Sequence, residues 1–432
     1  MNELITRADR FEEILKELGA EKYSFVLQES EKQEFNTEGS EFKLLRTTFG
    51  GSVSLQVFCG TRMGTAGGND QSEEGLKALA QTALASAESS PEDPAHDIAP
   101  DQGKDAFRQG ACEPELDKLF ERLQEMLADI KTSYPLVNIM AVISSYMKSH
   151  SVYRNTNGTE FERLRGSYDV TLEFSASDGT QNTGLDYVSV LTDTLDQPLL
   201  ELGSLKQKLE DVQKQLGPTP MSGKFEGTVV FTPDCLGYFL YMIMMNYCTG
   251  GVILDGTSQW LDKVGETVAD ERLTVALDPF DPRIVCGERY TADGFRSEPV
   301  TVIENGVLKT HILELYTANK TGRPVTKNGA SALLVREGSE SLQDIIGSIG
   351  KGLLVGGFSG GSPGANGEFS GVAKNSFLIE NGKIGGAVTE TMISGNLGRM
   401  LRQVRGISRE SFADGSSVLP YLAVDGIVIS GK

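Results

Sequence analysis

The first eighteen residues place apolar side chains at helical spacing among charged ones. The apolar positions recur at steps of four and three residues, at Leu4, Ala8, Phe11, Leu15 and Leu18. This spacing puts them on one face of a helix, and Gly19 is the kind of residue that commonly ends one. Extended segments are predicted next over 23–28 and 43–59. A second helix is expected to begin after Ser72, which can cap it, and to continue through Ala87.

The same order of elements returns after residue 113. A second amphipathic helix is predicted by Leu116, Leu119, Leu123, Met126 and Ile130. Segments with the composition of strands follow at 137–144, 151–155, 159–174 and 187–192. Another helix is predicted by Leu202, Leu205, Leu209, Val212 and Leu216. The first half of the chain therefore has the order helix, strands, helix twice.

Two short segments support an internal duplication. Residues 36–46 and 155–165 are identical at seven of eleven positions, at a constant offset of 119 residues. One alternative is that turns favour Asn and Gly wherever they occur. Turn chemistry does not account for the shared Glu-Phe and Leu-Arg pairs, so we favour a repeated unit.

Breaks rich in proline divide the chain. Residues 91–112 contain Pro91, Pro94 and Pro100 and are predicted to form a surface linker. Repeat unit 1 is expected at 1–90, repeat unit 2 at 113–217 and a β-rich domain at 222–432. The predicted fold class is α+β, with an N-terminal α/β domain made of the duplicated unit and a β-rich C-terminal domain after it.

Hairpins and a glycine-rich run characterise the second half. Asn305-Gly306 and Asn381-Gly382 each stand between two runs rich in β-branched residues, which is a strong hairpin signal. Residues 236–247 are apolar and long enough for a buried helix. Between Gly347 and Gly371 there are ten glycines in 25 residues. We expect a long flexible loop there, which could cover a cleft.

The net charge of the chain limits the classes of molecule that it is expected to bind. The chain has 60 acidic and 40 basic residues and a formal net charge of −20. A field of this sign repels phosphate backbones and anionic lipid, so binding to nucleic acid or to a membrane surface is not expected. The most apolar run, residues 238–245, is much shorter than the roughly 20 residues of a membrane span. No signal peptide is predicted, and we expect a soluble cytoplasmic protein.

Metal-ligating patterns are scarce. The five cysteines (Cys59, Cys112, Cys235, Cys248 and Cys286) include no C-x-x-C pair, and reduced buried thiols are expected. The histidines are His96, His150 and His311. His311 and Glu314 are three apart in a predicted strand, where they would face opposite sides. We therefore predict no metal site and no bound cofactor, and we assign no catalytic residue.

Two serines lie in a pattern that hydrolases use. Ser359 and Ser362 each match G-x-S-x-G, the turn that presents a nucleophilic serine. That chemistry needs a histidine later in the chain, and none follows His311. Because the surrounding run is so rich in glycine, we interpret both matches as compositional.

Several segments of the second half resemble the TldD/PmbA family, often labelled modulator of DNA gyrase. They are 294–309 (GFRSEPVTVIENGVLK), 367–371 (GEFSG), 379–382 (IENG) and 393–397 (ISGNL). Their order and spacing make the resemblance specific. It implies a two-domain protein that pairs into a dimer, in a cytosolic system with metallopeptidase activity on small or unfolded peptides.

The resemblance also separates two branches of the family. The TldD branch carries H-E-x-x-x-H on a helix, which binds zinc, and a cysteine near the C-terminus; the PmbA (TldE) branch lacks them. Aligned without gaps, the helix falls on residues 241–246 (YMIMMN) and the cysteine near 414–417 (DGSS). None of residues 241–246 supplies a zinc ligand, and no cysteine follows Cys286. This chain is therefore similar to the PmbA branch.

Three functions remain open on the sequence. The leading hypothesis is a non-catalytic subunit that pairs with a zinc-bearing TldD-like paralogue, or with itself, around a peptide in a shared cleft. The first alternative is a metal-independent hydrolase that uses Ser359 or Ser362. The second is a peptide-binding module without chemistry.

Overall fold

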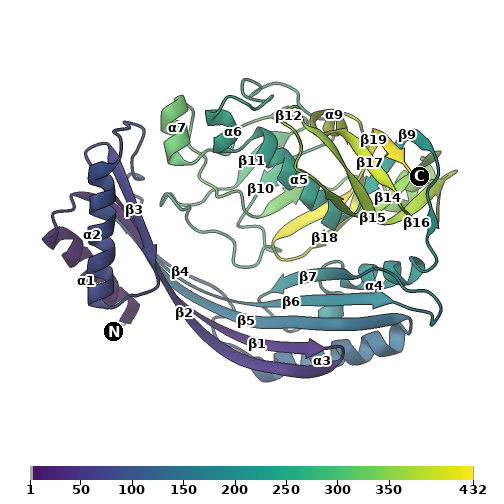
Figure 1. The fold of residues 1–432 in the computed structure, drawn as a ribbon, viewed down its shortest axis with the longest axis horizontal. Helices are drawn as coiled ribbons and strands as arrows, with labels where there is room; N and C mark the ends of the chain where they lie inside the picture. The colour runs from purple at the N-terminus through teal and green to yellow at the C-terminus, as the bar shows by residue number, and fades with distance from the viewer. Residues whose placement is uncertain (1–2, 432) are drawn as a thin grey trace.

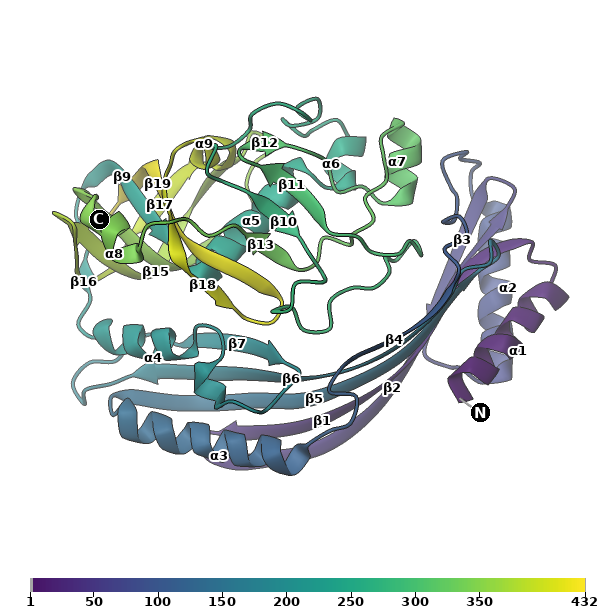
Figure 2. The same cartoon turned by 180° about the vertical axis from the view of Figure 1, so that it is seen from behind.

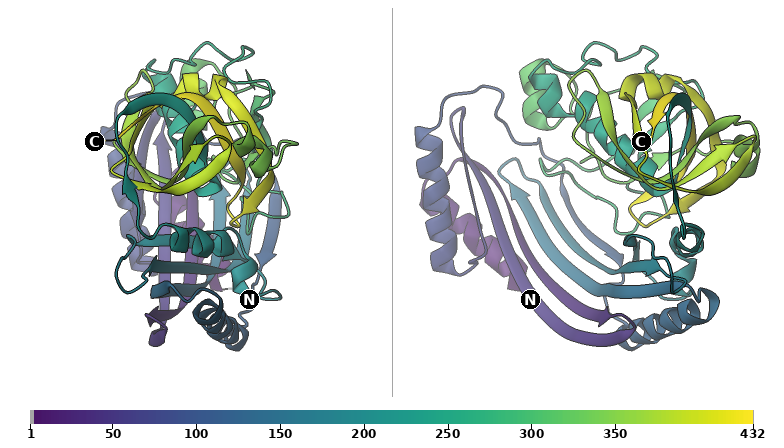
Figure 3. Two further views of the ribbon diagram at one scale, coloured as in Figure 1. Left: turned by 90° about the vertical axis from the view of Figure 1, so that its right-hand side faces the viewer. Right: turned by 45° about the vertical axis from the view of Figure 1, so that its right-hand side comes forward.

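The computed structural model describes residues 3–431 and has two parts (Figure 1). An N-terminal α/β part is built on one long curved sheet, and a β-rich C-terminal part lies over the hollow of that curve (Figures 2 and 3). The predicted α+β class is confirmed. Among the described residues, no helix combines the length and the apolar character that crossing a bilayer requires.

The N-terminal sheet has seven strands in the order β3-β2-β1-β5-β6-β4, with β7 also paired to β6. They are β1 (Lys22–Glu38), β2 (Glu41–Cys59), β3 (Arg62–Gly68), β4 (Lys104–Gly110), β5 (Val137–Asn155), β6 (Glu160–Ala176) and β7 (Asp186–Thr192). β1 and β5 pair antiparallel and form the middle of the sheet. Ser24 lies opposite Asn155 at one end of this pairing, and Asn36 lies opposite Ile143 at the other. β2 and β6 flank this pair on opposite sides.

Four helices cover this sheet and form two hydrophobic cores. They are α1 (Glu3–Glu17), α2 (Glu73–Ser89), α3 (Leu116–Ser133) and α4 (Leu205–Lys214). α1 and α2 pack on one end of the sheet around Phe11 and Phe25, which meet edge to face at 5.0 Å. α3 and α4 pack on the other end around Tyr146 and Tyr168. Most of the apolar positions of the predicted helices are buried, whereas Leu18, Leu116, Leu202 and Leu216 are half-buried.

The strand order bears on the proposed duplication. The two matching segments form the turns between β1 and β2 and between β5 and β6, and each turn has a left-handed glycine, Gly39 or Gly158. β2 and β6 thus lie at equivalent places on either side of the β1–β5 pair. The duplication and the domain limits stay predictions, which superposition of the two units would test.

The expected linker proved more structured than its prolines suggested. Residues 104–110 form β4, which pairs parallel with β6. Lys104 lies opposite Glu160 at the start of this pairing, and Gly110 lies opposite Gly166 at its end. Ala95, Ile98 and Ala99 are buried. Only pairing with a strand that comes 56 residues later makes this segment extended, so its local sequence carried no such signal.

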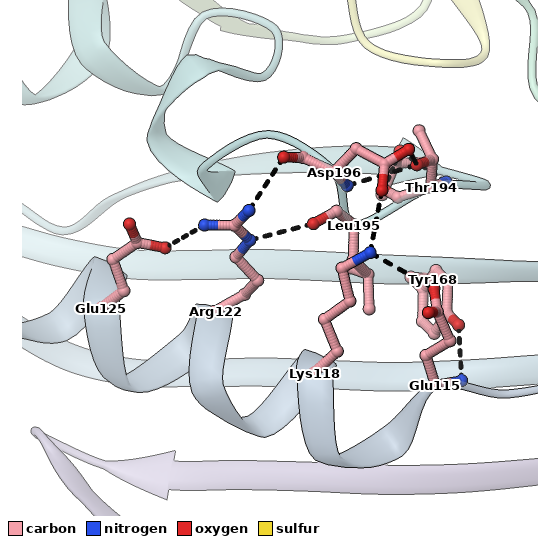
Figure 4. A network of polar contacts seen from close by, with 9 residues as sticks. Glu115, Lys118, Arg122, Glu125, Tyr168, Thr194, Leu195 and Asp196 are labelled. Atoms are coloured by element: carbon pink, nitrogen blue, oxygen red, sulfur yellow. Dashed lines mark hydrogen bonds and ion pairs between the residues drawn. The ribbon is translucent and has the colours of Figure 1, made fainter.

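The connection from β7 to α4 is tied to α3 by charged side chains (Figure 4). Arg122 donates hydrogen bonds from Nε to the carbonyl oxygen of Leu195 (2.9 Å) and from a terminal nitrogen to that of Asp196 (2.8 Å). Lys118 Nζ lies 2.8 Å from the Asp196 carboxylate. These contacts satisfy backbone carbonyls at a turn whose Leu195 side chain is fully buried.

The C-terminal part contains a second sheet, with twelve strands. These are β8 (Thr219–Pro220), β9 (Lys224–Phe231), β10 (Val275–Leu277), β11 (Val300–Glu304), β12 (Val307–Leu308), β13 (Leu333–Val335), β14 (Lys351–Gly360), β15 (Glu368–Glu380), β16 (Lys383–Thr389), β17 (Met392–Asn396), β18 (Val404–Ala413) and β19 (Ser417–Ser430). β17 pairs with both β15 and β19. This closes β19, β9, β14, β15 and β17 into a ring.

Helices fill and flank this ring. They are α5 (Pro233–Tyr247), α6 (Gly250–Leu254), α7 (Leu315–Thr321), α8 (Leu342–Gly347) and α9 (Leu397–Arg402). α5 belongs to the largest hydrophobic core, in which the Phe231 and Phe239 rings lie 4.4 Å apart. The predicted buried helix over 236–247 is confirmed.

Both predicted hairpins are present, and the predicted glycine loop is wrong. Asn305-Gly306 joins β11 to β12 and Asn381-Gly382 joins β15 to β16, all four residues with positive φ. The glycine-rich run instead contains all of β14 and the start of β15, with a short turn over 361–367. Its glycines allow close packing: a Cβ at Gly360 or Gly371 would lie within 2.6 Å of the Phe358 ring.

Candidate functional site

The site is built around α5, because the family resemblance places its metal motif there. The helix begins at Pro233, after Thr232, whose hydroxyl accepts from the Cys235 N–H. Most of its side chains are buried in the core of the C-terminal part. Three large apolar or aromatic side chains at spacings of three and four residues are exposed: Tyr238 (41 %), Tyr241 (60 %) and Met245 (46 %).

The residues at the motif positions do not fit zinc. H-E-x-x-x-H would fall on Tyr241, Met242 and Asn246, which offer a phenol, a thioether and an amide. Zinc sites in proteins use thiolate, imidazole and carboxylate donors. Within residues 3–431, no three His, Cys, Asp or Glu side chains cluster in a way that could hold a metal ion. No step of a reaction is therefore derived through zinc bound by this chain.

The segment where the family cysteine would lie has a structural role instead. Asp414–Ser417 form the turn between β18 and β19, in which the Asp414 carboxylate accepts from the Ser416 and Ser417 N–H groups, both at 2.7 Å. The Asp414 carbonyl oxygen accepts from the Leu191 N–H at 2.8 Å. A Cβ at Gly415 would lie 2.1 Å from the Leu191 carbonyl oxygen. The turn thus holds the C-terminal part against β7.

A groove separates the two parts beside α5. One cavity of about 420 Å³ lies between β7, the start of α5 and β14. A second of about 540 Å³ lies between residues 182–185 and β15–β16. The two share Leu185, Lys374 and Asn375 as lining residues, so they adjoin one another along the groove. The exposed Tyr238 of α5 lines its first half.

A half-buried cluster of charges lies at the base of this groove. Lys208 on α4 has Nζ 3.5 Å from an Asp234 oxygen and 3.7 Å from an Asp186 oxygen, and its side chain is 13 % exposed. Burial lowers the pKa of the Lys208 ammonium, but Asp234 and Asp186 together outweigh burial and leave it raised. Ser204 also donates to the Asp234 carboxylate. The cluster joins the first turn of α5 to the N-terminal part.

A second junction lies at the opposite end of the sheet. Tyr290 packs among Phe107, Tyr153 and Phe161, with ring centroids 5.0–6.3 Å apart. Arg296 lies over the Phe161 ring and forms a 2.6 Å ion pair with Asp105. Sequence reasoning missed both junctions, because their members come from segments far apart in the chain.

The candidate serines do not form a nucleophilic site. Ser359 lies near the end of β14, paired with Val372, and Ser362 lies in the turn after that strand; both are exposed. The three histidines are engaged elsewhere. Nε2 of His311 lies 2.9 Å from the Trp260 carbonyl oxygen, His150 contacts Glu162, and His96 stacks on Tyr316. His96 is half-buried.

His311 and Glu314 point to different partners. Burial lowers the pKa of the His311 imidazole, and the Trp260 carbonyl only partly offsets this. The Glu314 carboxylate instead accepts from the Thr317 hydroxyl. The two side chains therefore do not form a chelating pair.

Two family models match the chain. One, described as PmbA/TldA metallopeptidase C-terminal domain, matches residues 222–431, and the other, PmbA/TldA metallopeptidase domain 1, matches residues 23–87. A metalloprotease PmbA homolog of Haemophilus influenzae is 25 % identical over 98 % of this chain and 94 % of its own. A zinc metalloprotease TldD homolog of Saccharolobus solfataricus is 22 % identical over 67 % of this chain and 68 % of its own.

Solved structures share the whole fold. TldE from Thermococcus kodakarensis superposes with a TM-score of 0.85 at 22 % identity and covers 98 % of this chain and 100 % of its own. A candidate modulator of DNA gyrase from Bacteroides thetaiotaomicron gives 0.87 at 23 % identity, with full coverage of both chains. From the family models, the full-length relatives and the shared fold, we conclude that this chain belongs to the PmbA/TldD family.

Proposed function

We propose that this chain is the PmbA/TldE-like, non-catalytic subunit of a cytosolic TldD/TldE-type metallopeptidase system that acts on small or unfolded peptides. One observation carries the proposal. The α5 positions where the family's zinc motif would fall hold Tyr241, Met242 and Asn246, in a chain that otherwise has the family fold over 98 % of its length. Losing all the donors removes both the metal and the water that it would activate.

The groove beside α5 supports a role in holding peptide. It runs between β7, an edge strand, and the β14–β15 hairpin, so extended backbone lies on both walls. Its lining mixes apolar side chains such as Leu185 and Tyr238 with the charged Lys374. Such a lining suits an extended peptide of mixed sequence. The catalytic zinc would come from a TldD-like partner, and a relative of this chain carries the name zinc metalloprotease TldD homolog.

Metal content and peptide turnover test the proposal together. After dialysis, the isolated chain should retain zinc well below one equivalent and should leave an unstructured peptide intact. Adding a paralogue that carries H-E-x-x-x-H should produce cleavage, and chelator should abolish it. Stoichiometric zinc held by α5 of this chain would contradict the proposal.

Two other functions are separated by the same assay. If the isolated chain hydrolyses peptide in excess chelator, it is a metal-independent hydrolase, and Ser359→Ala and Ser362→Ala would show whether either serine is needed. If no complex forms with the paralogue but peptide binds, the groove serves a binding module without chemistry. Tyr238→Ala should then weaken peptide binding, with the distant Tyr316→Ala as the control.

A further inference from the structure

A further cavity between the two parts contains two arginines of β6. Its volume is about 300 Å³, and it shares no lining residue with the groove beside α5. Arg163 and Arg165 line one wall, and residues 284–288, 331–332 and 415–416 of the C-terminal part line the other. Because the two arginines are two residues apart on a strand, they project from the same face of the sheet.

Neither guanidinium has an acidic partner among residues 3–431. Arg163 donates from Nε to the side-chain oxygen of Gln109 at 2.7 Å. One of its terminal nitrogens donates to the carbonyl oxygens of Cys286 (2.6 Å) and Gly287 (3.1 Å). These acceptors are neutral. The Arg165 side chain forms no hydrogen bond or ion pair within the described part of the chain.

The positive charge of this cavity is therefore uncompensated. Burial lowers the pKa of the Arg163 guanidinium, and the like charge of Arg165 lowers it further. Glu288 is the one acid among the lining residues. Its carboxylate already accepts from the Ser297 hydroxyl at 2.6 Å and from the Gly329 N–H at 3.0 Å. Two guanidinium groups thus outnumber the carboxylate in a chain whose net charge is −20.

The opposite wall has an unsatisfied donor and unusual backbone. Ser331 lines the cavity, and its buried hydroxyl has no hydrogen-bond partner among the described residues. A hydroxyl in this state can donate to an oxyanion. Ala330 and Ala332 both have a φ of +61°, and Cys286 has one of +50°. Such backbone is rare outside Gly, Asn and Asp, and it clusters where proteins hold ligands.

We propose that Arg163 and Arg165 form a binding site for an oxyanion, the carboxylate or phosphate group of a small ligand that enters this cavity. Guanidinium groups bind both kinds of oxyanion through paired N–H donors. Gln109 and the carbonyl groups of residues 286–287 hold Arg163 in place, whereas Arg165 is free to turn towards the ligand. The volume is at the lower end of the range for small-ligand pockets. The site stands independently of the peptidase role proposed above.

Calorimetric titration of the full chain tests the site, with inorganic phosphate and succinate as separate probes. Ionic strength is held constant with sodium chloride, so that screening is equal in all titrations. We expect one saturable site, and the probe that binds more tightly identifies the preferred group. Arg165→Gln should weaken its binding by roughly tenfold or more, because charge-assisted hydrogen bonds are lost.

Arg108→Gln is the matched control for this loss of charge. Arg108 lies on the neighbouring strand β4, its side chain is 64 % exposed, and it does not line the cavity. Its removal should change the affinity by about twofold at most, because exposed charges are screened. Equal weakening by Arg165→Gln and Arg108→Gln would overturn the proposal, because binding would then follow the general field of the surface.

Melting temperatures separate ligand binding from a structural role of Arg165. Without anion, Arg165→Gln should melt no lower than the wild-type protein, because it loses no hydrogen bond and relieves repulsion at Arg163. The tighter probe should raise the melting temperature of the wild-type protein but not that of the variant. A variant that melts lower and responds to the probe as the wild-type protein does would show that Arg165 is structural, and the proposal would fail.

The thiol of Cys286 reports on the position of the anion. Cys286 lines the same cavity, so saturating probe should slow its modification by iodoacetamide in a Cys59→Ser chain. Modification at an unchanged rate would place the anion elsewhere and overturn the proposal. So would the absence of saturable binding of either probe up to about 10 mM, because an affinity weaker than that does not indicate a built site.

Discussion

The phenol of Tyr153 fits into the space that Gly294 leaves open. Its hydroxyl donates a 3.0 Å hydrogen bond to the Asp293 carbonyl oxygen, and a Cβ on Gly294 would lie 2.1 Å from that hydroxyl oxygen. Gly294 also has a φ of +91°. Tyr153 is on β5 in the middle of the N-terminal sheet, so this fit fixes where the C-terminal part rests on it.

Gly294→Ala should destabilise the protein by about 3 kcal/mol or more, because it adds a clash with Tyr153 to left-handed backbone strain. Chemical denaturation measures the loss. Gly265→Ala is the matched control: its φ is +87°, but the space around it is open. That variant should lose only the backbone cost of about 1–2 kcal/mol. Equal losses in both would show that the contact with Tyr153 is not tight.

Asp93 should make the contact between residues 91–103 and α7 depend on pH. Lys320, the Ala95 N–H and the Tyr316 hydroxyl bind its carboxylate and lower its pKa to about 2. This pKa is below the value of about 3.9 that an Asp side chain has in the unfolded chain. The stabilisation of the fold by the ionised Asp93 carboxylate is therefore complete above about pH 4 and is lost as pH falls towards 2. At neutral pH, the urea concentration at the midpoint of unfolding should therefore be higher for the wild-type protein than for Asp93→Asn.

The gap between those two midpoints should narrow as pH is lowered from about 4, within the range where the protein stays folded. Glu92→Gln is the control, because the neighbouring Glu92 side chain is 68 % exposed and pairs with Arg62. A gap that stays constant with pH would mean that the charge of Asp93 does not act through Lys320.

The native thiols should react in a fixed order. Burial raises the pKa of the Cys248 thiol to about 12 and raises that of Cys235 still further, and both are buried. Cys59, at the end of β2, and Cys286 are half-buried, and burial raises the pKa of the Cys286 thiol. A thiol reagent should therefore modify Cys59 first, and Cys59→Ser should remove the fast phase that Cys235→Ser leaves in place. A fast phase lost in Cys235→Ser would contradict this order.

Arg122 should contribute measurably to stability through the turn that it holds (Figure 4). Arg122→Ala removes two charge-assisted hydrogen bonds to the Leu195 and Asp196 carbonyls and should cost about 1–3 kcal/mol. Arg108→Ala is the control, since the Arg108 side chain is 64 % exposed and its ion pair with Glu113 spans 3.6 Å. That change should stay within about 0.5 kcal/mol. Thermal and urea unfolding report both variants.

Local patterns predicted the elements that depend on local chemistry. The spacing of Leu4, Ala8, Phe11 and Leu15 predicted α1, because a helix has to bury one face. Asn305-Gly306 predicted a hairpin, because both residues tolerate the positive φ that the turn requires. In such cases the physical requirement and the sequence signal concern the same few residues.

Elements that depend on distant partners were missed. The glycines of β14 suggested a loop, because no local signal shows that the Phe358 ring covers Gly360 and Gly371. Likewise, Lys208 is an ordinary lysine of an amphipathic helix in the sequence. Its importance comes from Asp186 and Asp234, which only the folded chain brings within 4 Å.

The pairing of β19 sets an order on folding. β19 pairs with β9, β13, β17 and β18, all of which precede it in the chain. Until residues 417–430 have left the ribosome, the ring stays open and β9 lacks one neighbour. The N-terminal sheet needs nothing beyond Thr192 and can form earlier. During synthesis, the C-terminal part therefore passes through a state with exposed strand edges, in which it is most open to chaperones and to aggregation.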